Sequence, residues 1–156
     1  MNPEEFKKEL RQAKASAILR TSDNQAARNA MDAAVRGGFR IIEFTMTIPG
    51  ALDLIRDYSR QDGLLVGAGT VLTVQEARSA VEAGSCYLVS PVMDPEIIHE
   101  AAALGVASMP GCSTPTEMLA AHRQGAQLQK LFPAPGIGPA YVQQTLGPLP
   151  FLNIVP

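Results

Sequence analysis

Residues 39–70 read FRIIEFTMTIPGALDLIRDYSRQDGLLVGAGT, and this stretch decides the fold. Each of its ends is a short apolar run of the kind found in buried strands of a parallel sheet. Between these runs Pro49 can open a helix, in which Leu52, Ile55 and Tyr58 recur at helical spacing. The stretch is therefore predicted to form one strand–helix–strand unit.

The same alternation continues on both sides of this unit. Helices are predicted at about 23–35, 49–58, 73–84, 94–104, from 114 onward and at 139–146, and strands at 15–20, 39–45, 64–70, 86–90, 106–110, 127–132 and 151–156. A doubly wound open sheet usually stops at about five or six strands, whereas seven short units favour a closed barrel. We therefore expect an α/β fold of the (β/α)8 TIM-barrel type.

The length of the chain conflicts with a complete barrel. Such a barrel typically needs about 200 to 250 residues, but this chain has 156 and ends with the seventh predicted strand. We expect a single domain over residues 1–156 that is C-terminally incomplete. Two explanations stay open: loss of the last β/α unit, with a partner covering the exposed edges, or a sequence that is a fragment.

Composition excludes several function classes. With 46% hydrophobic residues and a net charge of -2, the chain is typical of a soluble globular domain and lacks the basic clusters that bind nucleic acid or anionic membranes. No apolar run approaches the roughly 20 residues of a membrane span, and the charged N-terminus does not resemble a leader, so a cytoplasmic protein is predicted. Cys86 and Cys112 are predicted to be reduced thiols, and His99 and His122 lack ligand spacing, so no metal is expected.

Polar residues follow the predicted strands at their carboxyl ends, which is where parallel α/β folds place active sites. We expect them to converge on one rim. They are Arg20, Glu43 with Thr45, Thr70 of the GAGT segment, Ser90 with Pro91, Pro110 with Gly111, and Lys130.

Lys130 is the least expected of these, because an ammonium group among apolar strand residues is costly to desolvate. An amine in apolar surroundings loses its proton more readily and can attack a carbonyl to form a Schiff base. Strand alternation puts Glu43 on the same face as Ile41, where a carboxyl group suits proton transfer. The alternatives are a lysine that reaches solvent and a buried Lys–Glu ion pair without catalysis.

The other rim residues have weaker signals. GAGT lacks the full G-x-G-x-x-G spacing, so it is a poor dinucleotide motif. Thr70 and Ser90 can bond a hydroxylated substrate or only cap a turn. Arg20 can bind a substrate carboxylate, or it can form a salt bridge with Asp23 or another acid of the rim.

The order of several sequence blocks resembles the 2-keto-3-deoxy-6-phosphogluconate (KDPG) and 4-hydroxy-2-oxoglutarate (KHG) aldolase family. The blocks are GFRIIEFT, VGAGTVLT, AGSCYLVSP, MPGCSTPTEM, LQKLFPA and LGPLPFLNIVP. The resemblance implies a class I, Schiff-base aldolase without a cofactor, which acts on a small keto acid and is usually a trimer. It implies that Lys130 is the nucleophile and Glu43 the general acid/base, that Thr70 lines the pyruvyl pocket, and that Pro91 and Pro110 shape it.

Two departures from the family pattern concern the substrate. The family's T-L-R-T block is TMTIP here, with Thr47 in place of a substrate-binding arginine, and the phosphate-binding P-T-G-G loop would follow Pro156. The expected reaction is cleavage of a 2-keto-3-deoxy sugar acid, KDPG above all, to pyruvate and an aldehyde. The alternatives are cleavage of KHG, or a truncated and catalytically impaired homologue that acts as a binding or oligomeric module.

Overall fold

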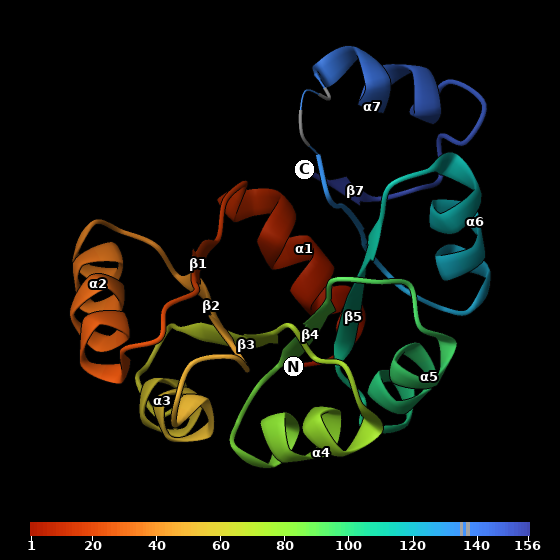
Figure 1. The fold of residues 1–156 in the computed structure, drawn as a ribbon. Coiled ribbons are helices and arrows are strands. Elements are labelled where there is room, and N and C mark those ends of the chain that lie inside the picture. The colour runs from red at the N-terminus through yellow and green to blue at the C-terminus, as the bar shows by residue number, and fades with distance from the viewer. Residues whose placement is uncertain (135, 137) are drawn as a thin grey trace.

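A computed structural model describes residues 1–134, 136 and 138–156, and it shows a curled parallel sheet with helices around it (Figure 1). The seven strands pair in chain order, and every neighbouring pair is parallel. The strands are β1 (Ala17–Leu19), β2 (Ile41–Thr45), β3 (Leu65–Gly69), β4 (Tyr87–Ser90), β5 (Ala107–Cys112), β6 (Gln129–Leu131) and β7 (Ile154–Val155). Consecutive order without a reversal identifies a barrel-type sheet that ends after the seventh strand, and it rules out the doubly wound alternative.

Helices alternate with the strands, as the sequence predicts. They are α1 (Pro3–Ala13), α2 (Asn24–Arg36), α3 (Ala51–Ser59), α4 (Val74–Glu82), α5 (Pro95–Ala103), α6 (Pro115–Arg123) and α7 (Pro139–Leu146). Helices α2 to α7 lie along the outer side of the curled sheet, whereas α1 lies within its curve (Figure 1). Among the described residues, no helix is long and apolar enough to cross a membrane.

The two faces of the sheet bury different cores because side chains alternate along each strand. On the outer face, Ile42, Phe44 and Leu88 pack with helix residues. On the inner face, Ile41, Tyr87, Val89, Met109 and Leu128 pack against Phe6 and Leu10 of α1. Helix α1 therefore fills the inside of the open barrel, and this inner face is the one that matters for the site.

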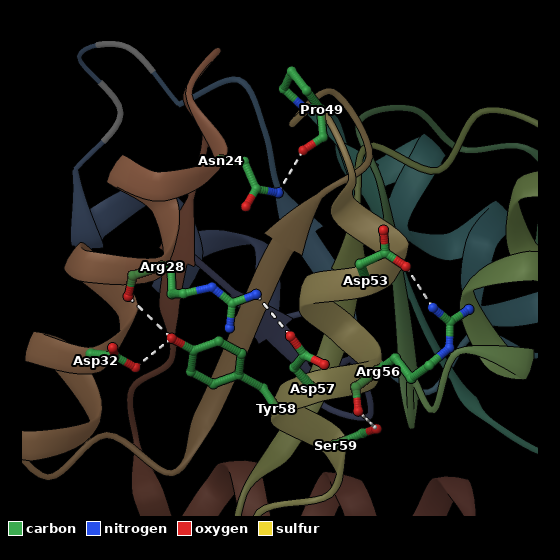
Figure 2. A network of polar contacts seen from close by, with 9 residues as sticks. All are labelled: Asn24, Arg28, Asp32, Pro49, Asp53, Arg56, Asp57, Tyr58 and Ser59. Atoms are coloured by element: carbon green, nitrogen blue, oxygen red, sulfur yellow. Dashed lines mark hydrogen bonds and ion pairs between the residues drawn. The ribbon is translucent and has the colours of Figure 1, made fainter.

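Local signals explain where most helices begin. Thr73 and Thr114 each form a capping box with the glutamate three residues later, and Asp23 caps α2. The prediction that Pro49 opens α3 is wrong: Gly50, with φ of 71°, is the N-cap and the helix begins at Ala51. Asn24 donates a 2.7 Å hydrogen bond to the Pro49 carbonyl, which holds this turn against α2 (Figure 2).

A polar network joins α2 to α3 on the outer side of the sheet (Figure 2). Arg28 forms a 2.7 Å ion pair with Asp57, and the buried Tyr58 hydroxyl bonds to Asp32. The Tyr58 ring packs against Phe44 of β2, with ring centroids 5.1 Å apart. These contacts fix the two helices that support β2, but they lie on the face opposite to the inner core.

Several strands are shorter than predicted, above all at the edges. Strand β1 contains only Ala17–Leu19, and β7 contains only Ile154 and Val155. An edge strand has hydrogen-bonding partners on one side only, which limits the ladder. Asn153 instead uses its side chain, accepting a bond from Arg11 of α1 and donating one to the Gln127 carbonyl.

Candidate active site

Lys130 lies in the middle of β6 on the inner face, where its alternation partner Leu128 belongs to the inner core. Lys130 is half-buried, although its apolar neighbours predict a fully buried residue. Its Nζ lies 5.2 Å from the centroid of the Phe132 ring. Lys130 lines a cavity of about 620 Å³ together with Ile18, Met109 and residues of α1 and β7. Its amine can therefore meet a small molecule without leaving the apolar inner face.

Glu43 lies on the same inner face, as strand alternation predicts, and it is only 1% exposed. Its Oε2 atom is buried, and no described residue donates a hydrogen bond to it. Burial raises the pKa of Glu43 to about 7, although the positive charges of Lys130 and Arg20 both act to lower it. Glu43 is not among the residues that line the 620 Å³ cavity, so the link between Glu43 and Lys130 is their shared face and electrostatic coupling.

The glycines of the GAGT segment make room for side chains of neighbouring strands. A Cβ at Gly67 would lie 2.2 Å from the Tyr87 ring, and a Cβ at Gly69 would lie 1.9 Å from Oε1 of Glu43. Both contacts are far closer than atoms allow, so any larger residue would displace its neighbour. The segment therefore shapes the space around Glu43, a role that its resemblance to a nucleotide-binding loop does not predict.

Gly69→Ala is expected to leave the protein folded but to move the Glu43 carboxylate. The clash is with the end of a flexible side chain, so the carboxylate can give way before the backbone does. A displacement of about 1 Å in a reacting group can cost about a hundredfold in rate. We expect the rate of the Glu43-dependent reaction to fall about 10- to 100-fold. A Cβ at Gly138 would meet no atom of the described residues within 4 Å, so Gly138→Ala is the control, and equal rates for the two variants would contradict the expectation.

Arg20 and Thr70 form a pair at the carboxyl ends of β1 and β3. Arg20 Nη2 donates a 3.0 Å hydrogen bond to Thr70 Oγ1. Thr70 has φ of 58°, an uncommon conformation for a β-branched residue and one that clusters at functional sites. Asp23 instead caps α2, so the alternative of an Arg20–Asp23 pair is not what the structure shows.

Ser90 and Pro110 do not join Lys130 on the inner face. They line a small outer space with Leu88 of β4 and Ile97 of α5. The Ser90 hydroxyl bonds to the backbone of Val92 and so closes its own turn. Their side chains do not converge with those of the other rim residues, because strand alternation turns both residues outward.

Pro91 does reach the inner side, through its backbone. Its carbonyl oxygen would lie 2.3 Å from a Cβ at Gly111, and Gly111 is the register partner of Lys130. The Pro91 carbonyl oxygen therefore lies over Gly111, on the strand next to Lys130.

A second polar pair lies at the end of β2. Thr45, on the same face as Glu43 and 1% exposed, shares a 2.8 Å hydrogen bond with Thr47. Thr47 stands where the family pattern has an arginine, so here that position is engaged with a neighbouring hydroxyl. Among the described residues, no group of three or more His, Cys, Asp or Glu side chains is placed to hold a metal ion.

The raised pKa of Glu43 makes a prediction for stability. The folded protein holds the Glu43 proton more tightly than the unfolded chain. The protonated Glu43 therefore contributes to the free energy of unfolding below about pH 4.5, and this contribution is lost as the pH rises through about 7. It amounts to about 3 kcal/mol at most, because one pKa unit is worth about 1.4 kcal/mol. We expect Glu43→Gln to raise the free energy of unfolding at pH 8 and to change it little at pH 5. Urea unfolding at both values measures this, and an equal effect of the substitution at both would contradict it.

A protein-family model matches nearly the whole chain. The model for KDPG and KHG aldolase matches residues 6–156.

Curated relatives carry names from the same group. A probable 2-dehydro-3-deoxy-6-phosphogalactonate aldolase of Rhizobium meliloti is 37% identical over 136 residues, which cover 86% of this chain and 64% of that protein. A 2-dehydro-3-deoxy-phosphogluconate aldolase of Zymomonas mobilis is 33% identical over 129 residues, or 83% of this chain and 62% of that protein. The chain thus spans less than two thirds of the length of these relatives.

Solved structures agree with the fold. The crystal structure of the 2-keto-3-deoxy-6-phosphogluconate aldolase of Zymomonas mobilis ZM4 with 3-phosphoglycerate aligns with a TM-score of 0.88 at 28% identity, and it covers 99% of this chain and 74% of that one.

Proposed function

The chain belongs to the KDPG and KHG aldolase family, and from this premise we propose that it is a class I aldolase that cleaves a 2-keto-3-deoxy sugar acid to pyruvate and an aldehyde. The observation that carries the proposal is that an amine and a buried carboxyl group share one apolar face. Lys130 lines a cavity there, and Glu43 has a pKa near 7. A nucleophile and a general acid/base are the two groups that the reaction needs.

Lys130 begins the proposed reaction. Its neutral amine attacks the C2 carbonyl of the keto acid to form a carbinolamine, which loses water to give a protonated imine. The imine then accepts the electron pair of the C3–C4 bond as that bond breaks, and an enamine forms. We assign Pro91, through its carbonyl oxygen, the role of accepting a hydrogen bond from the carbinolamine hydroxyl.

Glu43 moves the protons in these steps. As a carboxylate it removes the proton from the C4 hydroxyl, so that the aldehyde can leave. As a carboxylic acid it returns a proton to C3 of the enamine, and hydrolysis of the resulting imine releases pyruvate and free Lys130. A pKa of about 7 suits both roles, because neither form is scarce near neutral pH.

Arg20 and Thr70 are the proposed substrate-binding side chains. The guanidinium can form two parallel hydrogen bonds to the substrate carboxylate, and the Thr70 hydroxyl already orients it. The Ser90 and Pro110 side chains face α5, so we assign them only a structural part in the wall of the site.

The expected sugar acid is KDPG, and KHG cleavage is the second candidate. Thr47 favours the smaller KHG, because it is bonded to Thr45 and stands in place of the arginine that binds substrate in the family pattern. The test measures pyruvate release from KDPG, its galactonate epimer and KHG. Cleavage of any of them supports aldolase activity and ranks the substrates. If a folded chain releases pyruvate from none of the three substrates, the result would favour an impaired homologue that acts as a binding module.

We also propose that the chain works as a homo-oligomer, a trimer by family expectation, in the cytoplasm. The proposal is supported by the resemblance to a family whose members are usually trimers. Light scattering of the purified chain tests this, and a monomer at working concentration would contradict it.

A further inference from the structure

Glu43, Gly67 and Tyr87 form one row across the inner face of β2, β3 and β4. Glu43 is the register partner of Gly67, and Gly67 is the register partner of Tyr87. Because Gly67 has no side chain, the Tyr87 ring can lie across it, only 2.2 Å from where a Cβ would be. The ring therefore reaches over β3 toward the strand that carries Glu43.

The Tyr87 hydroxyl completes this reach. It donates a 3.0 Å hydrogen bond to the carbonyl oxygen of Ile42, the residue directly before Glu43. Tyr87 is 1% exposed, so neither the hydroxyl nor that carbonyl can exchange the bond for one to bulk water. The bond ties the β2 backbone at Glu43 to β4, across the intervening strand.

Phe6 of α1 covers the other side of the Tyr87 ring. The two rings stack with centroids 4.3 Å apart and an interplanar angle of 21°, and Phe6 is fully buried. Together the two rings form an apolar layer where α1 packs against the strands beside Glu43. Among the described residues, the charges that act on Glu43 come from Lys130 of β6 and from Arg20, directly after β1, and the aromatic layer adds none.

We propose that Tyr87 is a positioning residue for Glu43: its ring excludes water from the buried carboxyl group, and its hydroxyl anchors the backbone that carries that group. The inference rests on the proposed role of Glu43 as the acid/base of the reaction. Sequence reasoning does not find Tyr87, because its alternation with Val89 predicts only a core residue.

Loss of the ring should let water reach Glu43 and solvate its charged form. Desolvation is the largest cause of the raised pKa of Glu43, so water in this space should move its titration toward lower pH. Loss of the hydroxyl alone should keep water out but leave the Ile42 carbonyl without its donor, so that β2 is held less firmly. The two substitutions thus separate exclusion of water from anchoring.

The test follows the Glu43 carboxyl signal by NMR in the full chain labelled with carbon-13 at glutamate side chains, assigned by its loss in Glu43→Gln. We expect a midpoint near pH 7 in the unaltered chain and a fall of about one pH unit in Tyr87→Leu. Tyr87→Phe should shift the midpoint by less than half as much, while kcat for cleavage falls about 3- to 10-fold at unchanged KM. The control is Tyr58→Leu, which removes an equally buried tyrosine from the outer core.

An unchanged midpoint in Tyr87→Leu would overturn the proposal, and so would an equal fall in Tyr58→Leu, which would show general loosening. If Tyr87→Leu does not fold, Phe6→Leu thins the same layer from the α1 side and should lower the midpoint in the same direction. The titration needs no activity. A chain that cleaves no keto acid would therefore refute the proposed function, while the midpoints would still decide whether Tyr87 positions Glu43.

Discussion

Lys130→Arg abolishes covalent capture of pyruvate and lowers kcat/KM for keto-acid cleavage by a factor of about 10⁴ or more, if Lys130 is the nucleophile. Arginine keeps the positive charge beside Glu43, but its guanidinium stays protonated and cannot form the imine. The substitution therefore separates the chemistry of the amine from its electrostatic effect. Mass spectrometry after borohydride reduction and a pyruvate-release assay measure the two outcomes.

Lys14→Arg is the matched control. Lys14 follows α1 and lines the same 620 Å³ cavity, so a pyruvate that reacts with any nearby amine would also modify it. We expect the Lys14→Arg variant to capture pyruvate and to cleave substrate like the unaltered chain. Capture that persists in Lys130→Arg and disappears in Lys14→Arg would move the nucleophile from β6 to the end of α1.

Glu43→Gln is expected to lower kcat for cleavage by a factor of about 10² to 10⁴, the usual contribution of a general acid/base. Glutamine keeps the shape of the side chain and its place beside Gly69, but it cannot exchange a proton near neutral pH. Imine formation with pyruvate should slow but still reach completion over a long incubation, because the amine of Lys130 is intact. The measurements are the single-turnover rate of cleavage and the extent of borohydride capture.

The control for this substitution is Glu100→Gln, which breaks the 2.8 Å ion pair between Glu100 and Arg78 on the outer helices. Its kcat should stay within about twofold of the unaltered value, because an exposed ion pair contributes little to the stability of the fold and this one lies on the outer helices. A Glu43→Gln variant that cleaves as fast as Glu100→Gln would mean that another group moves the protons.

The sheet, and the positions of Lys130 and Glu43 on its inner face, could be predicted from local patterns. Alternation of Ile41, Glu43 and Thr45 placed the carboxyl group on the inner face, and cap residues such as Asp23 marked helix starts that the structure confirms. These features depend on a few neighbouring residues, so the sequence carries them directly. The same alternation, applied to Leu88 and Ser90, would have shown that Ser90 faces outward.

The environment of Glu43 could not be predicted in this way. The fit of Tyr87 over Gly67, and of Glu43 over Gly69, depends on the register between three strands. Register arises from the packing of the whole sheet, and no pattern within one strand encodes it. The start of α3 at Ala51 likewise follows from the positive φ of Gly50 rather than from the proline before it.

Borohydride reduction of the unaltered chain with pyruvate, followed by intact mass and peptide mapping, tests whether Lys130 is the Schiff-base nucleophile. We predict a single addition of about 72 Da, the mass of pyruvate joined as a reduced imine, on the peptide that contains Lys130. No addition to a folded chain, or an addition spread over Lys7, Lys8 and Lys14, would contradict the assignment of Lys130 as the Schiff-base nucleophile.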